Sequence, residues 1–281
     1  MASALGDVEI LTVDSMQVYR GMDVGTAKPS AEARALVTHH LLDLADPAED
    51  WSVTRWLDAA RTALSEVESR GRRALLVGGT GLYFQALVDE LSLPGRWPEV
   101  GATLEAEPDT AALHARLAAL DPTAAARIEV GNRRRVLRAL EVTLGSGRPF
   151  SASGPGLSTY PPTRWRLAGI WLPRASGSRR IAERFAAMLG GGLLEEVDAL
   201  ARRPEGMSRT ARQALGYREL LAHLEGGVPL GEAAAEAVRR TTAFARRQRV
   251  WWRRDPRIRW LGAVEDPLAV VPALLGDWGT P

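Results

Sequence analysis

Two loops, each following a short apolar strand, contain the side chains best suited to chemistry. Asp14 comes directly after the strand expected at residues 8–13 and opens a loop that runs to Asp23. Gly78-Gly79-Thr80-Gly81 follows the strand expected at 74–77 and leads to Tyr83. A carboxylate fixed at a strand end is a candidate general base, and a glycine turn brings backbone and a hydroxyl close to a ligand. Both loops are expected at the carboxyl edge of a parallel sheet, where α/β folds bind ligands.

Each of these features also has a purely structural interpretation. Asp14 or Ser15 could simply cap a following helix, and the residue pattern alone slightly favours this. The glycine turn lacks the full Gly-x-x-x-x-Gly-Lys-Ser/Thr pattern of a phosphate loop, so a tight connection explains it equally well. His39-His40 invites a metal interpretation, but adjacent histidines point in different directions and no third ligand follows at the usual spacing. We therefore expect one histidine to pack and the other to hydrogen-bond.

Basic residues are concentrated in two segments, although the net charge is only +2. Residues 239–259 contain nine arginines together with Trp251 and Trp252, and a second group lies at 133–138. Arginine binds phosphates with a planar fork and stacks on bases, which lysine does not. The clusters indicate a polyanionic partner. A solvated helix face with an apolar stripe is the alternative, and the pattern does not decide which arginines bind.

The elements that must position these loops follow a strand, helix, strand, glycine turn, helix order, which is typical of a parallel α/β core. Ser52 caps the first of these helices, which Gly71 ends. A helical insertion with a linker is expected at 94–160, leaving 1–93 and 161–281 as the α/β core. Further expected elements are helices at 110–120, 122–129 and 133–144, a strand at 165–172 returning to the sheet, two helices separated at 190–192, and a long helix at 232–254.

Composition excludes several classes of protein. The chain has no cysteine, so disulfides, thiolate metal sites and a cysteine nucleophile are ruled out. No apolar run approaches the ~18 residues of a membrane helix, and the N-terminus lacks a signal-peptide pattern. We expect a cytoplasmic protein that does not bind membranes.

The residues from Asp14 to Pro29 resemble the signature of the tRNA dimethylallyltransferases, also called isopentenyl-tRNA transferases. Sixteen matching positions are highly specific, and further motifs come in the family's order. These are His39-His40-Leu41, Trp51-Ser52-Val53, Val77 to Tyr83, Arg135 to Val142, Gly192 to Val197, Gln213 to Arg218, Ala245 to Gln248 and Trp251 to Arg254. The resemblance extends over roughly residues 5–262.

This resemblance implies an α/β fold with a phosphate-loop NTPase-like parallel sheet core and a helical insertion. It implies transfer of a dimethylallyl group from dimethylallyl diphosphate to the exocyclic amine of the adenosine 3′ of the anticodon, assisted by Mg²⁺. The expected partners are tRNA, through its anticodon stem-loop, and dimethylallyl diphosphate, and the expected state is a monomer. An anticodon loop offers its bases nearly unpaired, so one nucleotide can be extruded at low cost.

The resemblance also implies roles for particular residues. Asp14 matches the general base, which removes the proton of an adenine amine whose lone pair is delocalised into the ring. Arg246, Arg247 and Gln248 match a basic motif expected near phosphates. No residue is implied as a metal ligand. The positions that match tRNA contacts are Ser15, Met16, Gln17, Thr80, Arg134, Arg135, Val136, Leu137, Arg138, Gln213, Tyr217 and Arg218.

The sequence departs from the family at its beginning. The family opens with a strand and a phosphate loop, whereas only thirteen residues precede Asp14 here, with no lysine and one glycine, Gly6. We therefore expect the first strand and the phosphate loop to be missing from a truncated chain. Their loss would leave the diphosphate unbound and would expose a sheet edge and apolar surface. A non-catalytic protein that binds anticodon loops is the alternative function, and a small-metabolite kinase with the same core is a third.

Overall fold

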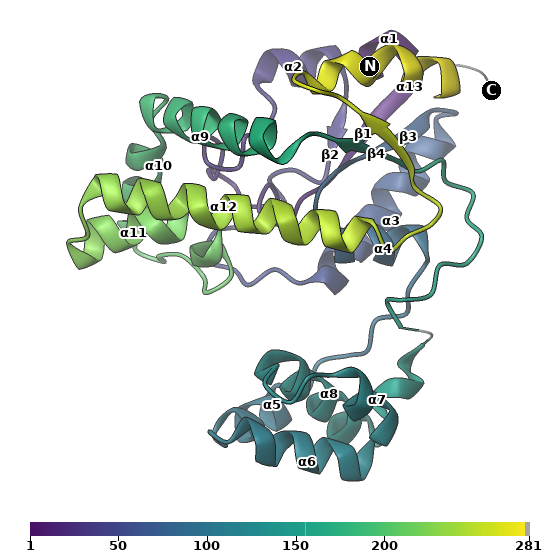
Figure 1. Ribbon diagram of the computed structural model, residues 1–281, viewed down its shortest axis with the longest axis vertical. Coiled ribbons are helices and arrows are strands. Elements are labelled where there is room, and N and C mark those ends of the chain that lie inside the picture. Colours follow the sequence, from purple (N-terminus) through teal and green to yellow (C-terminus); the bar gives the residue numbers. More distant parts are fainter. Residues whose placement is uncertain (155, 279–281) are drawn as a thin grey trace. The chain divides into compact units, whose positions relative to one another are not determined.

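The computed structural model describes residues 1–154 and 156–278. The chain forms two compact units. One combines Met1–Val88 with Pro162–Pro281, and the other is Asp89–Pro161. Figure 1 shows the α/β elements of the first unit and the helices of the second. The sequence-based expectation of an α/β class is confirmed by the parallel strands described next.

A three-stranded parallel sheet forms the centre of the first unit (Figure 1). Its strands are β1 (Val8–Val13), β2 (His39–His40) and β3 (Arg73–Gly78), in the order β2-β1-β3. Strand β1 pairs with β3 from Val8 opposite Arg73 to Val13 opposite Gly78. Leu11 and Val13 are fully buried, as the apolar sequence of the central strand requires. The strands expected at 8–13 and 74–77 are confirmed, and β2 was not anticipated.

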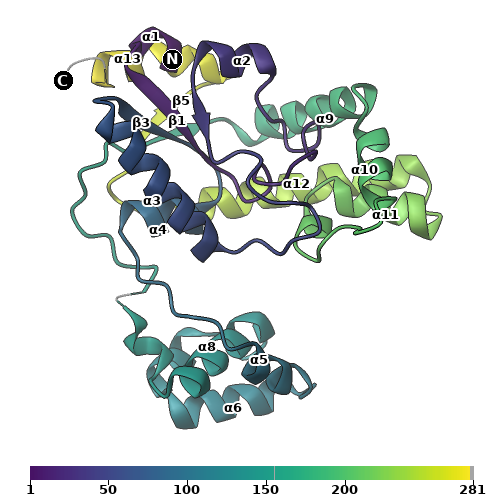
Figure 2. The same cartoon turned by 180° about the vertical axis from the view of Figure 1, so that it is seen from behind.

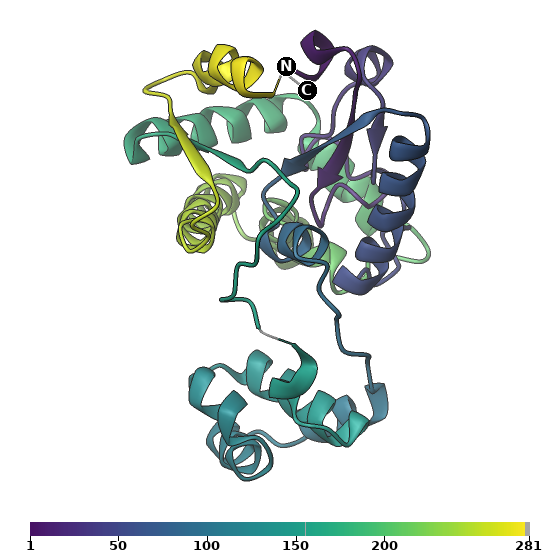
Figure 3. The ribbon, with the colours of Figure 1, turned by 90° about the vertical axis from the view of Figure 1, so that its right-hand side faces the viewer.

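Strands β4 (Ala168–Trp171) and β5 (Arg259–Gly262) form a separate parallel pair (Figure 3). The prediction that the strand near 165–172 returns to the first sheet is wrong, because among the described residues β4 pairs with β5 alone. Arg259 N donates to Leu167 O at 3.0 Å and Ala263 N donates to Trp171 O at 2.9 Å. The partner strand lies about ninety residues along the chain, and no local pattern in β4 could specify it.

Apolar side chains on both sheets reach solvent. Val77 of β3 is 47% exposed and Ile170 of β4 is 46% exposed. Strand β3 lies at one end of the β2-β1-β3 order, so one of its edges has no strand partner among the described residues.

Helices surround the two sheets, and α3 (Val53–Ser69) packs along β1 and β3 (Figure 2). Ser52 caps α3 as expected, because its side chain accepts a hydrogen bond from Arg55 N. The long α12 (Leu230–Trp252) packs against α9 (Arg174–Gly190) and α11 (Tyr217–Gly226). The remaining elements of this unit are α1 (Ala2–Leu5), α2 (Ala31–Leu36), α4 (Gly81–Val88), α10 (Leu193–Ala201), α13 (Val271–Trp278) and the 3₁₀ turns Ala211–Gln213 and Pro267–Val270.

The second unit is a small helical bundle of α5 (Pro98–Glu105), α6 (Thr110–Leu120), α7 (Pro122–Arg127) and α8 (Arg133–Ser146), followed by the 3₁₀ turn Phe150–Ser153. Its core is apolar and includes Leu104, Leu113, Leu117, Val136 and Leu140. The predicted helix at 110–120 is confirmed, and α7 ends two residues before the predicted 129. In the part of the chain that the structure describes, no helix is both long and apolar enough to span a membrane.

Candidate active site

Asp14 begins the loop that follows β1, and one of its oxygens organises that loop. Asp14 Oδ1 accepts hydrogen bonds from Met16 N at 2.7 Å and from Gln17 N at 3.3 Å. The carboxylate therefore closes a turn rather than capping a helix, because the next helix begins only at Ala31. Among the described residues Asp14 Oδ2 has no hydrogen-bond partner. One oxygen is thus held by the backbone while the other is available to a ligand.

The glycine turn after β3 lies beside this loop. Ser15 N donates to Thr80 Oγ1 at 3.2 Å, and Thr80 N donates to Val13 O at 3.3 Å. A Cβ atom at Gly78 would lie 2.1 Å from Val13 O, so only glycine allows the two strand ends to approach this closely. Val13 and Gly78 are partners in the parallel register, and their carboxyl ends therefore meet at one edge.

The C-terminal half of α12 contacts both sheets at their carboxyl ends. Gln248 Nε2 donates to Gly79 O at 2.9 Å, and Arg249 Nη2 donates to Leu172 O at 2.6 Å just beyond β4. A Cβ atom at Gly81 would lie 2.4 Å from the Trp251 ring, which shows how closely the helix packs on the glycine turn. The sequence-predicted residues Asp14, Ser15, Thr80 and Gln248 are therefore brought together.

The arginines at 239–259 divide into two groups by their partners. Four arginines near the ends of the segment are paired with carboxylates: Arg239 with Glu236, Arg240 with Glu219, Arg257 with Asp255 and Arg259 with Asp277. The five between them have no carboxylate partner among the described residues, and four of these are exposed: Arg246, Arg247, Arg253 and Arg254. The fifth, Arg249, is half-buried. Burial, with the charges of Arg253 and Arg174, lowers the pKa of Arg249 below its ordinary value.

An excess of positive charge without counter-ions therefore lies on the part of α12 that contacts the glycine turn. Such a surface attracts a polyanion, because each arginine is already solvated and loses no internal ion pair on binding. A solvated helix face, the alternative left open by the sequence, accounts better for Arg239 and Arg240, which are paired with acids of the same unit.

Comparison with known proteins decides the family. A family model described as IPP transferase matches residues 17–255. A tRNA dimethylallyltransferase of Salinispora arenicola is 47% identical, over 97% of this chain and 81% of the relative, and one of Streptomyces avermitilis is 46% identical, over 95% and 86%. The chain belongs to the tRNA dimethylallyltransferase family.

Solved structures of tRNA dimethylallyltransferases and related proteins share the fold. A tRNA isopentenylpyrophosphate transferase from Bacillus halodurans superposes with a TM-score of 0.69 at 33% identity, covering 98% of this chain and 91% of that one. A eukaryotic dimethylallyltransferase acting on tRNA gives a TM-score of 0.78 at 21% identity, covering 98% and 77%. The expected phosphate-loop NTPase-like class is confirmed by this likeness.

Three further residues of the family's expected tRNA-contact set lie in the 3₁₀ turn Ala211–Gln213 and at the start of α11. Gln213 and Arg218 are exposed, and Arg218 Nη1 donates to Gln213 Oε1 at 3.3 Å. Tyr217 is fully buried, and its hydroxyl donates to Glu196. The Tyr217 side chain therefore presents no surface to a ligand in this structure, although its neighbours do.

The expected tRNA contacts at 134–138 lie on α8 of the second unit, and they too include both exposed and buried side chains. The side chains of Arg134 and Arg135 are exposed and have no protein partner among the described residues. Val136 is fully buried in the core of the bundle and Leu137 packs against that core, so their side chains stabilise the helix rather than face RNA. Arg138 Nη2 binds the carbonyls of Pro94 and Gly95, both at 2.8 Å, and Nη1 pairs with Glu141.

His39 and His40 are both hydrogen-bonded. His39 Nδ1 lies 2.7 Å from Val37 O, and His40 Nε2 lies 2.7 Å from Glu9 Oε2. The prediction that one of them only packs is wrong, because both rings are half-buried beside polar partners. Within residues 1–154 and 156–278, no group of three histidine or acidic side chains could hold a metal ion.

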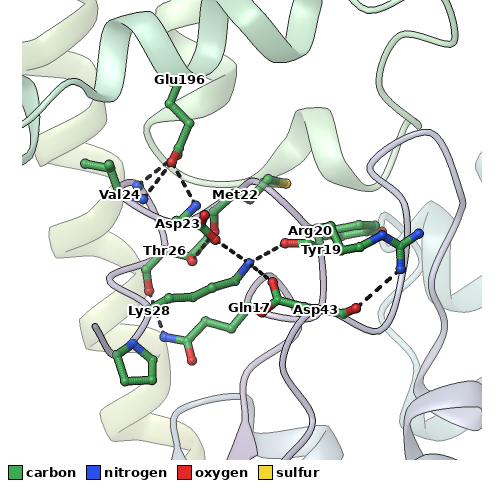
Figure 4. Close-up of polar contacts among 12 residues, drawn as sticks. Gln17, Tyr19, Arg20, Met22, Asp23, Val24, Thr26, Lys28, Asp43 and Glu196 are labelled. Atoms are coloured by element: carbon green, nitrogen blue, oxygen red, sulfur yellow. Dashed lines mark hydrogen bonds and ion pairs between the residues drawn. The ribbon is translucent and has the colours of Figure 1, made fainter. Parts of the chain in front are cut away.

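Sequence reasoning did not identify the residues that anchor the loop beginning at Asp14 to the rest of its unit. Lys28 is the only lysine of the chain, and its side chain is 2% exposed. It donates to Asp23 Oδ1 at 2.7 Å, to Asp43 Oδ1 at 2.6 Å and to Tyr19 O (Figure 4). A solitary lysine in a chain that otherwise uses arginine was the available signal, because an ammonium donates in three directions where a planar guanidinium does not.

Proposed function

We propose that this chain transfers the dimethylallyl group of dimethylallyl diphosphate to the exocyclic amine of the adenosine 3′ of the anticodon in tRNA, and that Asp14 is the general base. The observation that carries the proposal is the free Asp14 Oδ2 at the carboxyl end of β1, next to the Thr80 turn. Nothing in the described residues favours the non-catalytic tRNA-binding alternative or a kinase.

The proposed reaction gives Asp14 a defined task. The adenosine amine forms a bond to the first carbon of the dimethylallyl group as the bond from that carbon to the diphosphate oxygen breaks, and diphosphate leaves with the electron pair. The amine nitrogen becomes positively charged and loses its proton to Asp14 Oδ2. Backbone amides fix Oδ1, so the carboxylate does not have to be ordered when the adenine of the tRNA arrives. A positioned base of this kind contributes about 10²–10⁴-fold.

The arginines without carboxylate partners supply the proposed binding surface for tRNA. Arg246, Arg247, Arg253 and Arg254 are exposed on or just after α12, the helix that Gln248 ties to the glycine turn. Phosphates of an anticodon stem-loop bound there would place a loop base near the carboxyl edge of the sheet. Gln213 and Arg218 are proposed as further contacts, as are Ser15, Met16 and Gln17 of the Asp14 loop. Arg134 and Arg135 are proposed contacts of the helical unit.

Magnesium enters the proposal with the donor substrate. The described residues contain no cluster of three acidic or histidine side chains, so they do not fit a metal ion held in a protein cage. Mg²⁺ is commonly bound through substrate phosphates with one or two carboxylates, and it would neutralise the leaving diphosphate. We assign no step of the mechanism to it.

We further propose a cytoplasmic location and a monomeric state, the latter testable by sedimentation.

The decisive experiment incubates the chain with unmodified tRNA, Mg²⁺ and dimethylallyl diphosphate, then digests the tRNA and searches by mass for prenylated adenosine. Product formation by the chain, and its loss in Asp14→Asn, supports the proposal. If no prenylated adenosine forms, the assay is repeated with a protein whose coding sequence is extended upstream in the same reading frame. Transfer by the extended protein would show that the added residues complete the site. No transfer by it, with tRNA binding intact, would favour the non-catalytic alternative.

A further inference from the structure

Glu196 of α10 binds three successive backbone amides of the loop at residues 14–28, which begins at Asp14. Its Oε2 accepts from Asp23 N at 2.9 Å and from Val24 N at 2.7 Å, and its Oε1 accepts from Gly25 N at 3.2 Å (Figure 4). Hydrogen bonds to an ionised acceptor are about twice as strong as neutral ones. A side chain more than 170 residues away along the chain therefore fixes the far half of the loop.

Tyr217 holds Glu196 from the other side. Its hydroxyl donates to Glu196 Oε1, the oxygen that also accepts from Gly25 N. Burial, and then the hydrogen bond to Glu196, raise the pKa of Tyr217 above its ordinary value, so the phenol stays a donor. A Cβ atom at Gly25 would lie 2.4 Å from the Tyr217 ring, so the amide reaches Glu196 only because this residue is glycine.

Gln17 connects the loop segment held by Glu196 to the catalytic carboxylate. Its side-chain Nε2 donates to Thr26 O at 2.8 Å and to Ala27 O at 3.3 Å, while its backbone amide donates to Asp14 Oδ1 at 3.3 Å. The same residue therefore binds both ends of the loop. A displacement of residues 23–27 would be transmitted through Gln17 to the turn that orients Asp14.

Lys28 holds the same segment on a different side. Its contacts with Asp23, Asp43 and Tyr19 O anchor the end of the loop to the body of the unit. Among the described residues, Lys28 and Glu196 do not contact each other, and only the Glu196 side chain accepts hydrogen bonds from the amides of 23–25. Removing Glu196 should therefore loosen the loop without releasing it.

We propose that Glu196 is a positioning residue for the transfer reaction, which together with Tyr217 sets the loop that orients Asp14. The inference rests on the proposed function, because it takes Asp14 as the base. Tyr217 lies next to Arg218, which is exposed and is a proposed tRNA contact. The Glu196 carboxylate therefore connects the start of α11, where tRNA is proposed to bind, with the loop that orients Asp14.

The first test is amide hydrogen exchange on the chain alone, which needs no catalytic activity. Glu196→Gln retains size but replaces one acceptor oxygen with an NH₂ donor, and Tyr217→Phe removes only the hydroxyl. The matched control is Glu195→Gln, the adjacent, exposed carboxylate in the same turn of α10, which contacts none of these amides. We expect exchange in peptides covering 14–28 to rise about ten-fold in both variants and to stay unchanged in Glu195→Gln. Unchanged exchange in both would overturn the proposal, and so would an increase spread over the whole unit.

The second test separates positioning from general stability. With saturating substrates we expect kcat to fall about ten-fold in Glu196→Gln and Tyr217→Phe while KM for tRNA stays near its original value. The double variant should lose little more than either single one, because both changes break the same contact. A normal kcat in both variants would contradict the proposal. If the unmodified chain makes no product, the proposed function fails by itself, and the exchange experiment still decides whether Glu196 orders the Asp14 turn.

Discussion

The backbone amide of Ser15 donates a hydrogen bond to Thr80 Oγ1 at 3.2 Å, although 65 residues separate them in sequence. This bond joins the loop after β1 to the loop after β3 and sets the side chain of Asp14 next to the glycine turn. Gln248 then connects that turn to the arginines of α12. The candidate base and the basic surface are thereby linked through two direct hydrogen bonds.

Replacing Asp14 by asparagine should remove transfer and retain the fold. Asparagine keeps a side-chain oxygen that can accept from Met16 N and Gln17 N, but it cannot take up a proton. We expect the single-turnover rate to fall about 10²–10⁴-fold with tRNA affinity nearly unchanged. Quenched-flow assays and filter binding measure the two quantities. Transfer at the normal rate would show that Asp14 is not the base.

The arginines without carboxylate partners should determine the salt dependence of tRNA binding. Each single-strand phosphate that a basic side chain neutralises contributes about 0.7 to the slope of log affinity against log salt. Alanine at Arg246, Arg247, Arg253 or Arg254 should make that slope shallower by this amount for every phosphate that the arginine neutralises. Arg239→Ala is the control and should change the slope less, because Arg239 is paired with Glu236. Equal effects at all five positions would mean that pairing does not select the RNA-binding residues.

Two glycines should respond in opposite directions to alanine. At Gly78 a Cβ atom meets the Val13 carbonyl at 2.1 Å, and backbone cannot move aside cheaply. We expect Gly78→Ala to lower the free energy of unfolding by about 1–3 kcal/mol, in the range of overpacked cores. Gly177 lies within α9 and has nothing within 4 Å of its Cβ position, so Gly177→Ala should stabilise by about 0.5–1 kcal/mol. Urea denaturation of both variants measures the difference.

Lys28→Met should destabilise the chain because it removes the buried cation that Asp23 and Asp43 share. Breaking a fully buried ion pair costs about 3–5 kcal/mol, but the Asp23 and Asp43 side chains are 57% and 33% exposed and Arg34 still contacts Asp43, so we expect a loss below that range. Arg55→Met is the control, since Arg55 and Glu49 form an exposed pair that contributes about 0–1 kcal/mol. Chemical denaturation at neutral pH gives both values. A small effect of Lys28→Met would mean that Arg34 suffices to hold Asp43.

Acid should weaken the fold through Glu9 and Asp43. Hydrogen bonds from Arg70 lower the pKa of Glu9. Burial opposes ionisation of Asp43, but Lys28 and Arg34 outweigh it and lower that pKa too. A carboxyl with a depressed folded-state pKa stabilises fully above its unfolded value, about 4.3 for Glu and 3.9 for Asp, and loses this contribution as pH falls through the folded value. The free energy of unfolding should therefore fall below about pH 4.3, less steeply in Glu9→Gln than in the exposed control Glu66→Gln.

Much of the core and of the site could be predicted from sequence. The apolar run at 8–13, the Ser52 cap and the glycine turn at 78–81 encode their strands and helices locally, since each depends on side-chain period or on backbone freedom within a few residues. Asp14 was placed correctly at a strand end for the same reason. The family signature supplied the reaction, because a run of sixteen specific positions has few alternative explanations.

The tertiary structure alone decided which partner each group has. Pairing of β4 with β5, burial of Lys28, the contact of Glu196 with three amides and the pairing of Arg240 with Glu219 all join residues from separate elements of the chain. A sequence pattern shows that a strand needs a partner strand or that a charge needs a counter-ion, but it does not identify the distant group that supplies it. That choice follows from packing the helices on the sheets, which fixes distances that no local preference contains.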